Sequence, residues 1–387
     1  MNNNDLSGIE LARREKLKKS KPKVLDKILK QPELIAQGKS VALIVLNYEY
    51  ICNFKCDHCS SDGLMIKNKL DREKSLARQH LTPTEVKKLF DQADSLGLSH
   101  VAISGGEPLS YKDFDEVIKA IGPERFWIAT DTNGWYLDDK RAKHLKAIGV
   151  DKVQISMDSF IREEHDSFRK KKGSYDRILR AIDASKDAGL EVLILTCVTK
   201  QRIYTQELID FLEFTKQKEV GAYVTLAKPI GAWAGNLEAV CGDQEIAHLD
   251  QLAAKYKIAT RWYGGYGVEM GCIAVKRSIT VTKYGHVMPC PYIQTSLGSI
   301  FEEKLETILN RGLDLRHFSY GEKRTCISGN KDHEFVQKYM PKIWNSKEPV
   351  PYEQIFDASD FISEEKARKW LESGKKKIII PITLLSE

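Results

Sequence analysis

The chain has 387 residues, 42% of them hydrophobic and 29% charged, which is typical of a globular protein with a large α/β domain and a smaller one. No run of about 18 apolar residues occurs and the N-terminus has no apolar signal core, so we expect a cytoplasmic protein without a membrane span. The net charge is +6, and residues 1–40 hold ten Lys or Arg against five Asp or Glu. This predicts a basic helical arm with a solvated face, and nucleic-acid binding is disfavoured because the body has no basic stripe.

Apolar runs of strand length alternate with helical periodicity from about residue 41 to about residue 260, which predicts a parallel sheet with helices between its strands. The expected strands are 41–46, 100–104, 126–130, 152–157, 191–198 and 222–226. The expected helices are 82–96, 112–121, 138–147, 174–189, 205–216 and 244–256. Thr82 should cap the first of these helices, with Glu85 completing a capping box. Because parallel sheets place ligands at the carboxyl ends of their strands, we expect the site residues there.

Three of the eight cysteines follow the first strand, as Cys52, Cys56 and Cys59 with three and two residues between them. In a chain without a secretion signal, such a cluster indicates metal rather than disulfides. Thiolates are soft ligands, and a loop this short can wrap one metal centre. Three ligands would leave one iron of a cubane cluster open, whereas a structural zinc site would need a fourth ligand, such as His58 or a distant cysteine.

The next three strands end in small and polar residues that suit one shared ligand. The second strand ends in Ser104, Gly105, Gly106, Glu107 and Pro108. Its paired glycines let a ligand approach the backbone, and its glutamate offers a carboxylate to a ligand amine. The third strand ends in Thr132 and Asn133, and the fourth in Ser156 and Asp158. Downstream, Arg169 is the natural partner for a ligand carboxylate.

With these residues the sequence resembles the radical S-adenosylmethionine (SAM) superfamily over about residues 41–230. The three cysteines match the family's spacing in full, and His58 stands where the family often has an aromatic residue. The resemblance implies an α/β fold, a partial (β/α)6 TIM-like barrel, that binds a [4Fe–4S] cluster and SAM. It implies SAM contacts by the GGEP-like motif with Glu107 at the amino group, by Thr132 and Asn133, by Ser156 and Asp158 at the ribose, by Arg169 at the carboxylate and by Val198 at the adenine.

A second group of cysteines follows the predicted barrel. Cys272 and Cys290 have seventeen residues between them, and a hairpin turning near Tyr284-Gly285 would bring them together. This resembles the SPASM or twitch extension, which binds an auxiliary iron–sulfur cluster, and it implies Cys326 as a third ligand. The family usually has a Cys-x-x-Cys pair at that point, but this chain has Cys326-Ile-Ser-Gly329.

Several interpretations of this second group stay open. The fourth ligand of an auxiliary cluster is Cys241, His333, a side chain from the barrel or the substrate itself. The alternative is that Cys272, Cys290 and Cys326 are buried apolar residues. The expected organisation is a basic helical arm over 1–40, a radical SAM core over 41–262, an α+β auxiliary-cluster extension over 263–340 with a helix at 301–310, and a C-terminal tail over 341–387 that packs on the core.

The resemblance implies a radical SAM oxidoreductase that cleaves SAM to a 5′-deoxyadenosyl radical and removes hydrogen from a small polar metabolite, giving oxidation or epimerisation. An electron donor such as flavodoxin or ferredoxin would reduce its cluster. The alternative within the family is an enzyme that matures a ribosomally made peptide. The alternative of another class is a non-catalytic iron–sulfur or zinc scaffold. We interpret Cys197, in the fifth strand, as a packing residue, although a cysteine at a strand end could donate a hydrogen atom.

Overall fold

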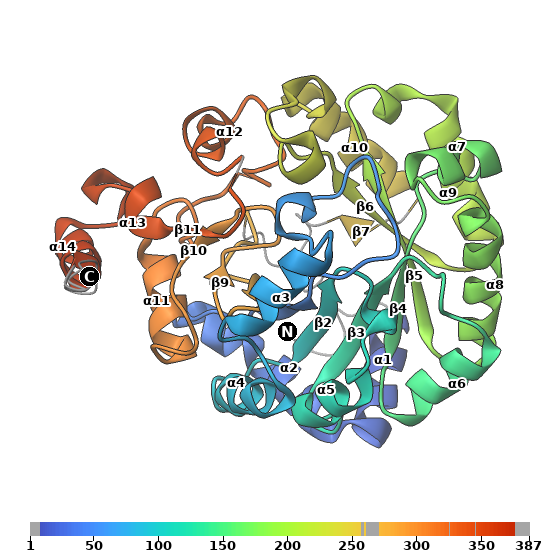
Figure 1. Cartoon of the computed structure of the whole chain (residues 1–387), viewed down its shortest axis with the longest axis horizontal. Helices are drawn as coiled ribbons and strands as arrows, with labels where there is room; N and C mark the ends of the chain where they lie inside the picture. Colours follow the sequence, from blue (N-terminus) through green and yellow to red (C-terminus); the bar gives the residue numbers. More distant parts are fainter. Residues whose placement is uncertain (1–7, 257–258, 261–270, 325, 345, 376–387) are drawn as a thin grey trace.

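The computed structural model describes residues 8–256, 259–260, 271–324, 326–344 and 346–375, and its centre is a curved sheet (Figure 1). In the described residues this sheet has nine strands in the order β7-β6-β5-β4-β3-β2-β1-β8-β9. The first seven are β1 (Leu43–Glu49), β2 (His100–Gly105), β3 (Trp127–Thr132), β4 (Lys152–Ser156), β5 (Glu191–Val198), β6 (Gly221–Leu226) and β7 (Ala259–Thr260). All of their pairings are parallel. The α/β barrel-like fold and its six expected strands are therefore confirmed, with β1 shifted along the chain.

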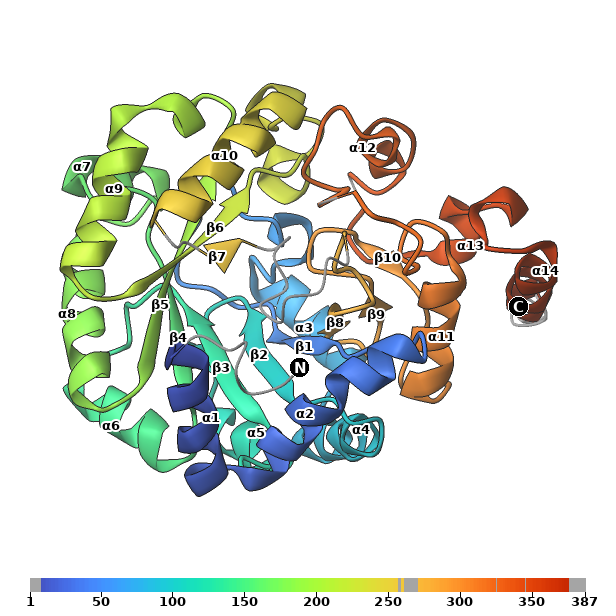
Figure 2. The same cartoon turned by 180° about the vertical axis from the view of Figure 1, so that it is seen from behind.

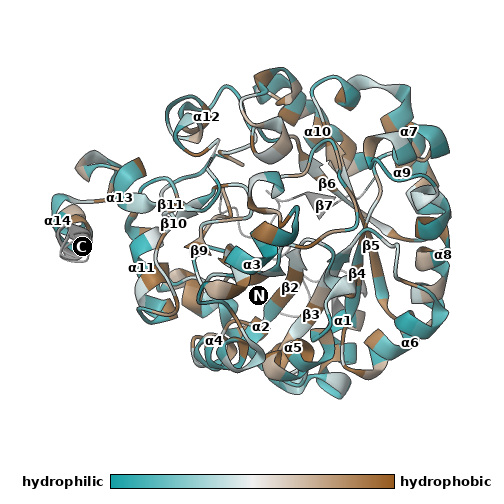
Figure 3. Ribbon diagram, viewed as in Figure 1, coloured by the Kyte–Doolittle hydropathy of each residue, from teal (hydrophilic) through white to brown (hydrophobic). Residues whose placement is uncertain are grey.

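Helices occur between the strands, most of them on the outside of the sheet, and each shows both polar and apolar residues (Figure 3). They are α3 (Lys69–Ala77), α4 (Pro83–Ser95), α5 (Phe114–Ile121), α6 (Asp139–Ala147), α7 (Arg162–Phe168), α8 (Ser174–Asp187), α9 (Gln206–Gln217) and α10 (Asp243–Tyr256). In α4 the Thr82 side chain accepts the Glu85 backbone N–H at 3.4 Å, as predicted. The capping box is incomplete, because the Glu85 carboxylate accepts the Thr82 hydroxyl rather than its backbone N–H.

The expected basic arm is two helices that pack across the amino-terminal ends of the strands, opposite the cysteine loop (Figure 2). These are α1 (Gly8–Ser20) and α2 (Pro22–Ala36). Lys21 forms an ion pair with Asp151 and donates to the carbonyls that precede β3 and β4. Val24 and Ile28 pack with Leu17 on Trp127. The arm is therefore solvated on one face only, because its inner lysines and apolar side chains close the end of the barrel.

The C-terminal extension begins by adding strands to the barrel sheet. β8 (Ser278–Thr282) pairs in parallel with β1, from Leu43 opposite Ser278 to Asn47 opposite Thr282. β9 (Val287–Met288) then pairs antiparallel with β8. The predicted hairpin at Tyr284-Gly285 is confirmed, with the Gly285 N–H donating to the Thr282 carbonyl at 2.9 Å.

The remaining elements are β10 (Thr295–Ser296), α11 (Leu305–Asp314), α12 (Glu334–Lys338), β11 (Val350–Pro351), α13 (Tyr352–Ile355) and α14 (Glu364–Lys375). The helix expected at 301–310 starts later, because the Ile300 N–H is held by the Gly285 carbonyl and a turn follows. Buried Asp360 accepts hydrogen bonds from His317 Nε2 at 3.1 Å and from the Tyr339 hydroxyl. These bonds connect three segments of the C-terminal region. Residues 376–387 of the expected tail lie outside the described residues. No helix in the described ranges is long and apolar enough to cross a bilayer.

Candidate active site

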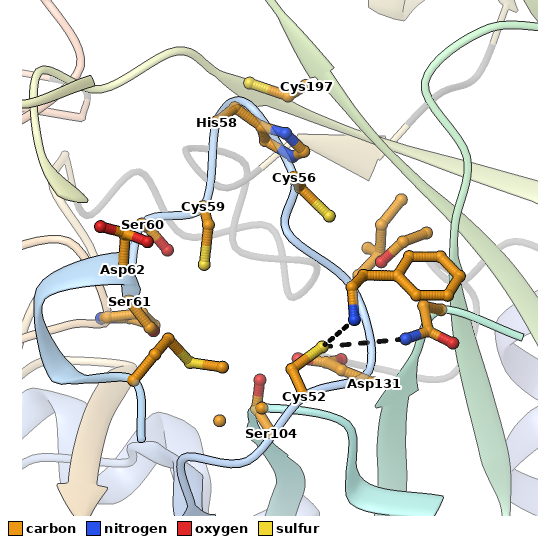
Figure 4. A pocket seen from close by; sticks show the side chains of 18 of the residues that line it. Cys52, Cys56, His58, Cys59, Ser60, Ser61, Asp62, Ser104, Asp131 and Cys197 are labelled. Carbon is orange, nitrogen blue, oxygen red and sulfur yellow. Dashed lines mark hydrogen bonds between the residues drawn. The ribbon is translucent and has the colours of Figure 1, made fainter. Parts of the chain in front are cut away.

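A cavity of about 590 Å³, here called the main cavity, opens at the carboxyl ends of the strands (Figure 4). The cysteine loop and the ends of β2 to β6 line it. The structure brings the following predicted residues to its wall: Cys52, Cys56, His58, Cys59, Ser104, Gly105, Gly106, Glu107, Thr132, Asn133, Ser156, Asp158 and Arg169. Pro108 and Val198 do not line it.

The three cysteines of the loop point into one space of this cavity (Figure 4). Cys52 Sγ accepts the Phe54 N–H at 3.4 Å and lies 3.9 Å from Asn133 Nδ2, while Arg169 donates to Cys56 Sγ at 3.7 Å. Burial raises the pKa of the Cys52 thiol to about 11 and that of Cys59 to about 12. Metal binding would displace these protons, and the N–H donors and the guanidinium would then stabilise the thiolates.

Glycines fix the cysteine loop by letting backbone segments touch. A Cβ on Gly106 would lie 1.9 Å from the Ile51 carbonyl oxygen, and one on Gly231 would lie 2.2 Å from the Cys59 carbonyl oxygen. Gly106 therefore has a second role beside the expected ligand approach, because it lines the main cavity and also leaves room for the chain that leads to Cys52. Sequence reasoning missed Gly231, whose partner lies about 170 residues away in the chain.

Glu107 is the buried carboxylate of the site, with a side chain that accepts three hydrogen bonds. It accepts from the Thr132 hydroxyl at 2.7 Å, the Asn133 N–H at 2.8 Å and the Leu109 N–H at 3.1 Å. Burial raises its pKa to about 7 despite these bonds. A carboxylate has about four acceptor positions, so one is left for a ligand ammonium.

Asp158 and Arg169, predicted as separate ligand contacts, bind each other. Arg169 Nε donates to Asp158 Oδ2 at 2.6 Å, and the Cys197 N–H donates to Asp158 Oδ1 at 3.1 Å. Burial alone would raise the pKa of Asp158, but the Arg169 charge, the neighbouring imidazoles and the Cys197 N–H together outweigh it, and the pKa lies below its usual range. A ligand carboxylate at Arg169 would therefore share the guanidinium with Asp158.

At the rim of the cavity His58 lies where expected, whereas Val198 of the fifth strand does not reach the cavity. His58 stacks on Phe168 with ring centres 4.6 Å apart, and burial lowers its pKa to about 4, so the imidazole is neutral. Val198 is fully buried on the other side of β5 from Cys197, because successive side chains alternate along a strand. Cys197 itself lines the cavity, so packing is not its only possible role and the option of hydrogen-atom donation stays open.

A second, much smaller cavity, here called the auxiliary thiol pocket, lies next to the first. It is lined by Cys272, Ile273, Ala274, Cys290, Tyr292, Cys326 and Ser328, and Tyr292 also lines the main cavity. The three predicted auxiliary cysteines thus come together. Cys241 and His333, two options for a fourth ligand, do not line it. His333 instead caps α12, with Nδ1 accepting the Phe335 N–H at 3.0 Å.

Two parts of the chain match known families. Residues 46–214 match the Radical SAM superfamily, and residues 272–332 match SPASM, an iron-sulfur cluster-binding domain. The chain is a radical SAM protein with a SPASM domain.

Curated relatives of this radical SAM protein carry several different activities in their names. It is 26% identical to an AdoMet-dependent heme synthase of Methanosarcina barkeri, over 71% of this chain and 84% of the relative. It is 31% identical to an Fe-coproporphyrin III synthase of the same organism and to a probable GTP 3′,8-cyclase of Methanosarcina acetivorans. Those two matches cover 47% and 49% of this chain but only 43% and 54% of the relatives.

Solved structures of other proteins share its fold. Streptococcus suis SuiB bound to the precursor peptide SuiA has a TM-score of 0.55 at 16% identity, covering 74% of this chain and 69% of SuiB. The anSMEcpe structure with bound AdoMet has a TM-score of 0.56 at 16% identity, covering 79% of this chain and 96% of that one.

The cofactors of this radical SAM protein are a [4Fe–4S] cluster and SAM, with auxiliary iron–sulfur binding in the SPASM domain. The donor set of the main cavity fits them. Its three thiols suit a cubane with one iron left for a further ligand, and the free acceptor position of Glu107 suits an ammonium.

Proposed function

We propose that the chain cleaves SAM reductively and oxidises a small polar metabolite held in the main cavity. The observation that carries this proposal is the convergence of the three-cysteine loop with the Glu107 carboxylate in one cavity, beside a second pocket of three thiols. When bound, the reduced cluster and SAM supply a radical that removes hydrogen from substrate. The cavity volume lies within the range usual for small-molecule sites.

The chain's own residues would bind and orient these groups. Cys52, Cys56 and Cys59 would hold the cluster, and Glu107 would hold the SAM amino group. The stacked rings of His58 and Phe168 would exclude water from the loop. The neighbouring auxiliary thiol pocket supports oxidation as the outcome, since a cluster there would accept an electron. A donor such as flavodoxin or ferredoxin would supply the first electron.

One observation favours epimerisation as a second candidate. Cys197 lines the main cavity, and burial raises its pKa to about 11, so it stays a thiol that can give a hydrogen atom. Once a substrate is in hand, deuterium taken up from D2O into the product would indicate epimerisation. An oxidised product without solvent deuterium would indicate oxidation.

The deciding experiment uses anaerobically reconstituted protein with SAM and dithionite. We expect 5′-deoxyadenosine from the wild-type chain and none from the variant with Cys52, Cys56 and Cys59 all changed to Ala. Cys241→Ala is the matched control, because Cys241 is buried but lines neither cavity. Retained SAM cleavage in the triple variant would contradict the assignment of Cys52, Cys56 and Cys59 as the cluster ligands. A wild-type protein that carries its iron–sulfur cluster but never cleaves SAM would favour the scaffold alternative.

A further inference from the structure

A buried lysine lies at the boundary between the main cavity and the auxiliary thiol pocket. Lys228 follows β6, is 5% exposed and lines the main cavity. Its Nζ donates to the Leu226 carbonyl at 2.7 Å and lies 4.6 Å from the ring centre of Tyr292. Because Tyr292 lines both cavities, the ammonium stands where they meet.

Gly329 brings this ammonium beside the third auxiliary thiol. A Cβ built on Gly329 would lie 2.8 Å from Lys228 Nζ and 3.1 Å from Cys326 Sγ. Gly329 stands where a Cys-x-x-Cys pair would have its second cysteine. The absent side chain therefore leaves room for a positive charge at the position of a fourth thiol.

We propose that Lys228 binds an anionic group of the substrate, a carboxylate or a phosphate, at the boundary of the two cavities. The inference rests on the proposed function and names the substrate class. An oxyanion there would gain a charge-assisted hydrogen bond in a site shielded from water, where such bonds are strong. The substrate would then lie between the cysteine loop and the auxiliary thiols.

The anion that Lys228 binds is distinct from the carboxylate of SAM. Glu107 follows β2 and Lys228 follows β6, and four strand spacings separate these positions in the sheet. Neighbouring strands lie about 4.8 Å apart, which gives about 19 Å along the curved sheet. If Glu107 holds the SAM amino group, the carboxylate on the same carbon lies on the β2 side of the cavity, whereas Lys228 lies on the β6 side.

The test measures anion-dependent thermal stability of the iron-loaded full chain without reductant. Inorganic phosphate or acetate replaces chloride at constant ionic strength, and the two anions distinguish a phosphate site from a carboxylate site. A bound anion raises the melting temperature of the wild-type chain. We expect Lys228→Met to lose most of this shift, Lys228→Arg to keep part of it, and the surface control Lys186→Met to keep it in full. SAM affinity should stay within about twofold in all three variants.

Other results would overturn the inference. These are no shift in the wild-type chain, an equal shift in Lys228→Met, or a loss of SAM affinity above about tenfold, which would assign Lys228 to the SAM site. If Lys228→Met does not fold, Gly329→Ala decides, because its Cβ displaces the ammonium without removing the charge. A reduced shift in Gly329→Ala supports the proposal and an unchanged shift contradicts it. SAM cleavage is measured in a separate assay, so a failure of the proposed function can be distinguished from a failure of the anion-binding proposal.

Discussion

Glu107 lies at a proposed ligand-binding position, and its burial destabilises the folded chain by an amount that depends on pH. Its pKa is about 7 in the folded chain, against 4.5 for an ordinary glutamate. Between these values the unfolded chain has released the proton and the folded chain still holds it. Raising the pH through this window therefore favours unfolding.

We predict that Glu107→Gln flattens this pH dependence and abolishes SAM binding. The free energy of unfolding of the metal-free chain would be measured by denaturant titration at pH 5 and pH 7. The wild-type chain should lose more stability than the variant between these values, by about 2 kcal/mol. Equal losses in both chains would show that Glu107 does not titrate in this range.

The site residues that were predictable are those whose own sequence neighbours define their role. Cys52, Cys56 and Cys59 have a diagnostic spacing, and all three line the cavity. The side-chain direction of Val198 was not predictable, since a shift of one residue reverses the face of a strand. The pairing of Asp158 with Arg169 was not predicted either, because the sequence identifies each residue as a candidate but does not indicate that the two side chains contact each other.

Among the structural elements, the cysteine loop is held in its conformation by contacts with other segments of the chain. The Cys59 carbonyl accepts the Ala232 N–H at 2.9 Å, and Gln294 Nε2 donates to the Ser60 carbonyl at 3.0 Å. Gly231 makes the first contact possible, with φ of +64° and no room for a Cβ. The loop therefore depends on segments after β6 and after β9.

We predict that Gly231→Ala loses iron from the first cluster while the helical content is unchanged. Gly189→Ala is the matched control, because Gly189 has φ of +73° but no atom within 4 Å of an added Cβ. Both variants have left-handed strain of about 1 kcal/mol, but only Gly231→Ala forces the Cys59 backbone to move. Iron per chain and circular dichroism provide the two readouts. Equal iron in both variants would mean that the close contact does not shape the loop.

Elements with strong local signals were predictable, and short polar ones were not. Helix α4 has a capping Thr82 and a buried apolar face, and it begins where expected. Helix α3 was missed because it is short and polar, although Asn68 caps it by accepting the Asp71 N–H at 2.9 Å. The pairing of β8 with β1 joins residues more than 230 positions apart, and no local pattern indicates it.

At the scale of the whole molecule, β8 makes the barrel and the SPASM domain share one sheet. It runs beside β1, whose end leads directly to the cysteine loop. Every residue of β8 is buried, and Val281 is fully so. Because β8 covers the edge of β1, we expect the two domains to unfold together rather than independently.

We predict that Val281→Asp lowers the melting temperature of the entire chain in a single transition. An unpaired charge in the shared sheet would destabilise the chain by several kcal/mol, about as much as a broken buried ion pair. Ile362→Asp is the control, because Ile362 is 52% exposed and the same charge there stays in water. Calorimetry gives the number of transitions, and hydrogen exchange at β1 shows whether the barrel opens with β8. An early transition confined to the SPASM domain, with β1 still protected, would show that the barrel is stable without β8 and that the shared sheet does not couple the two domains.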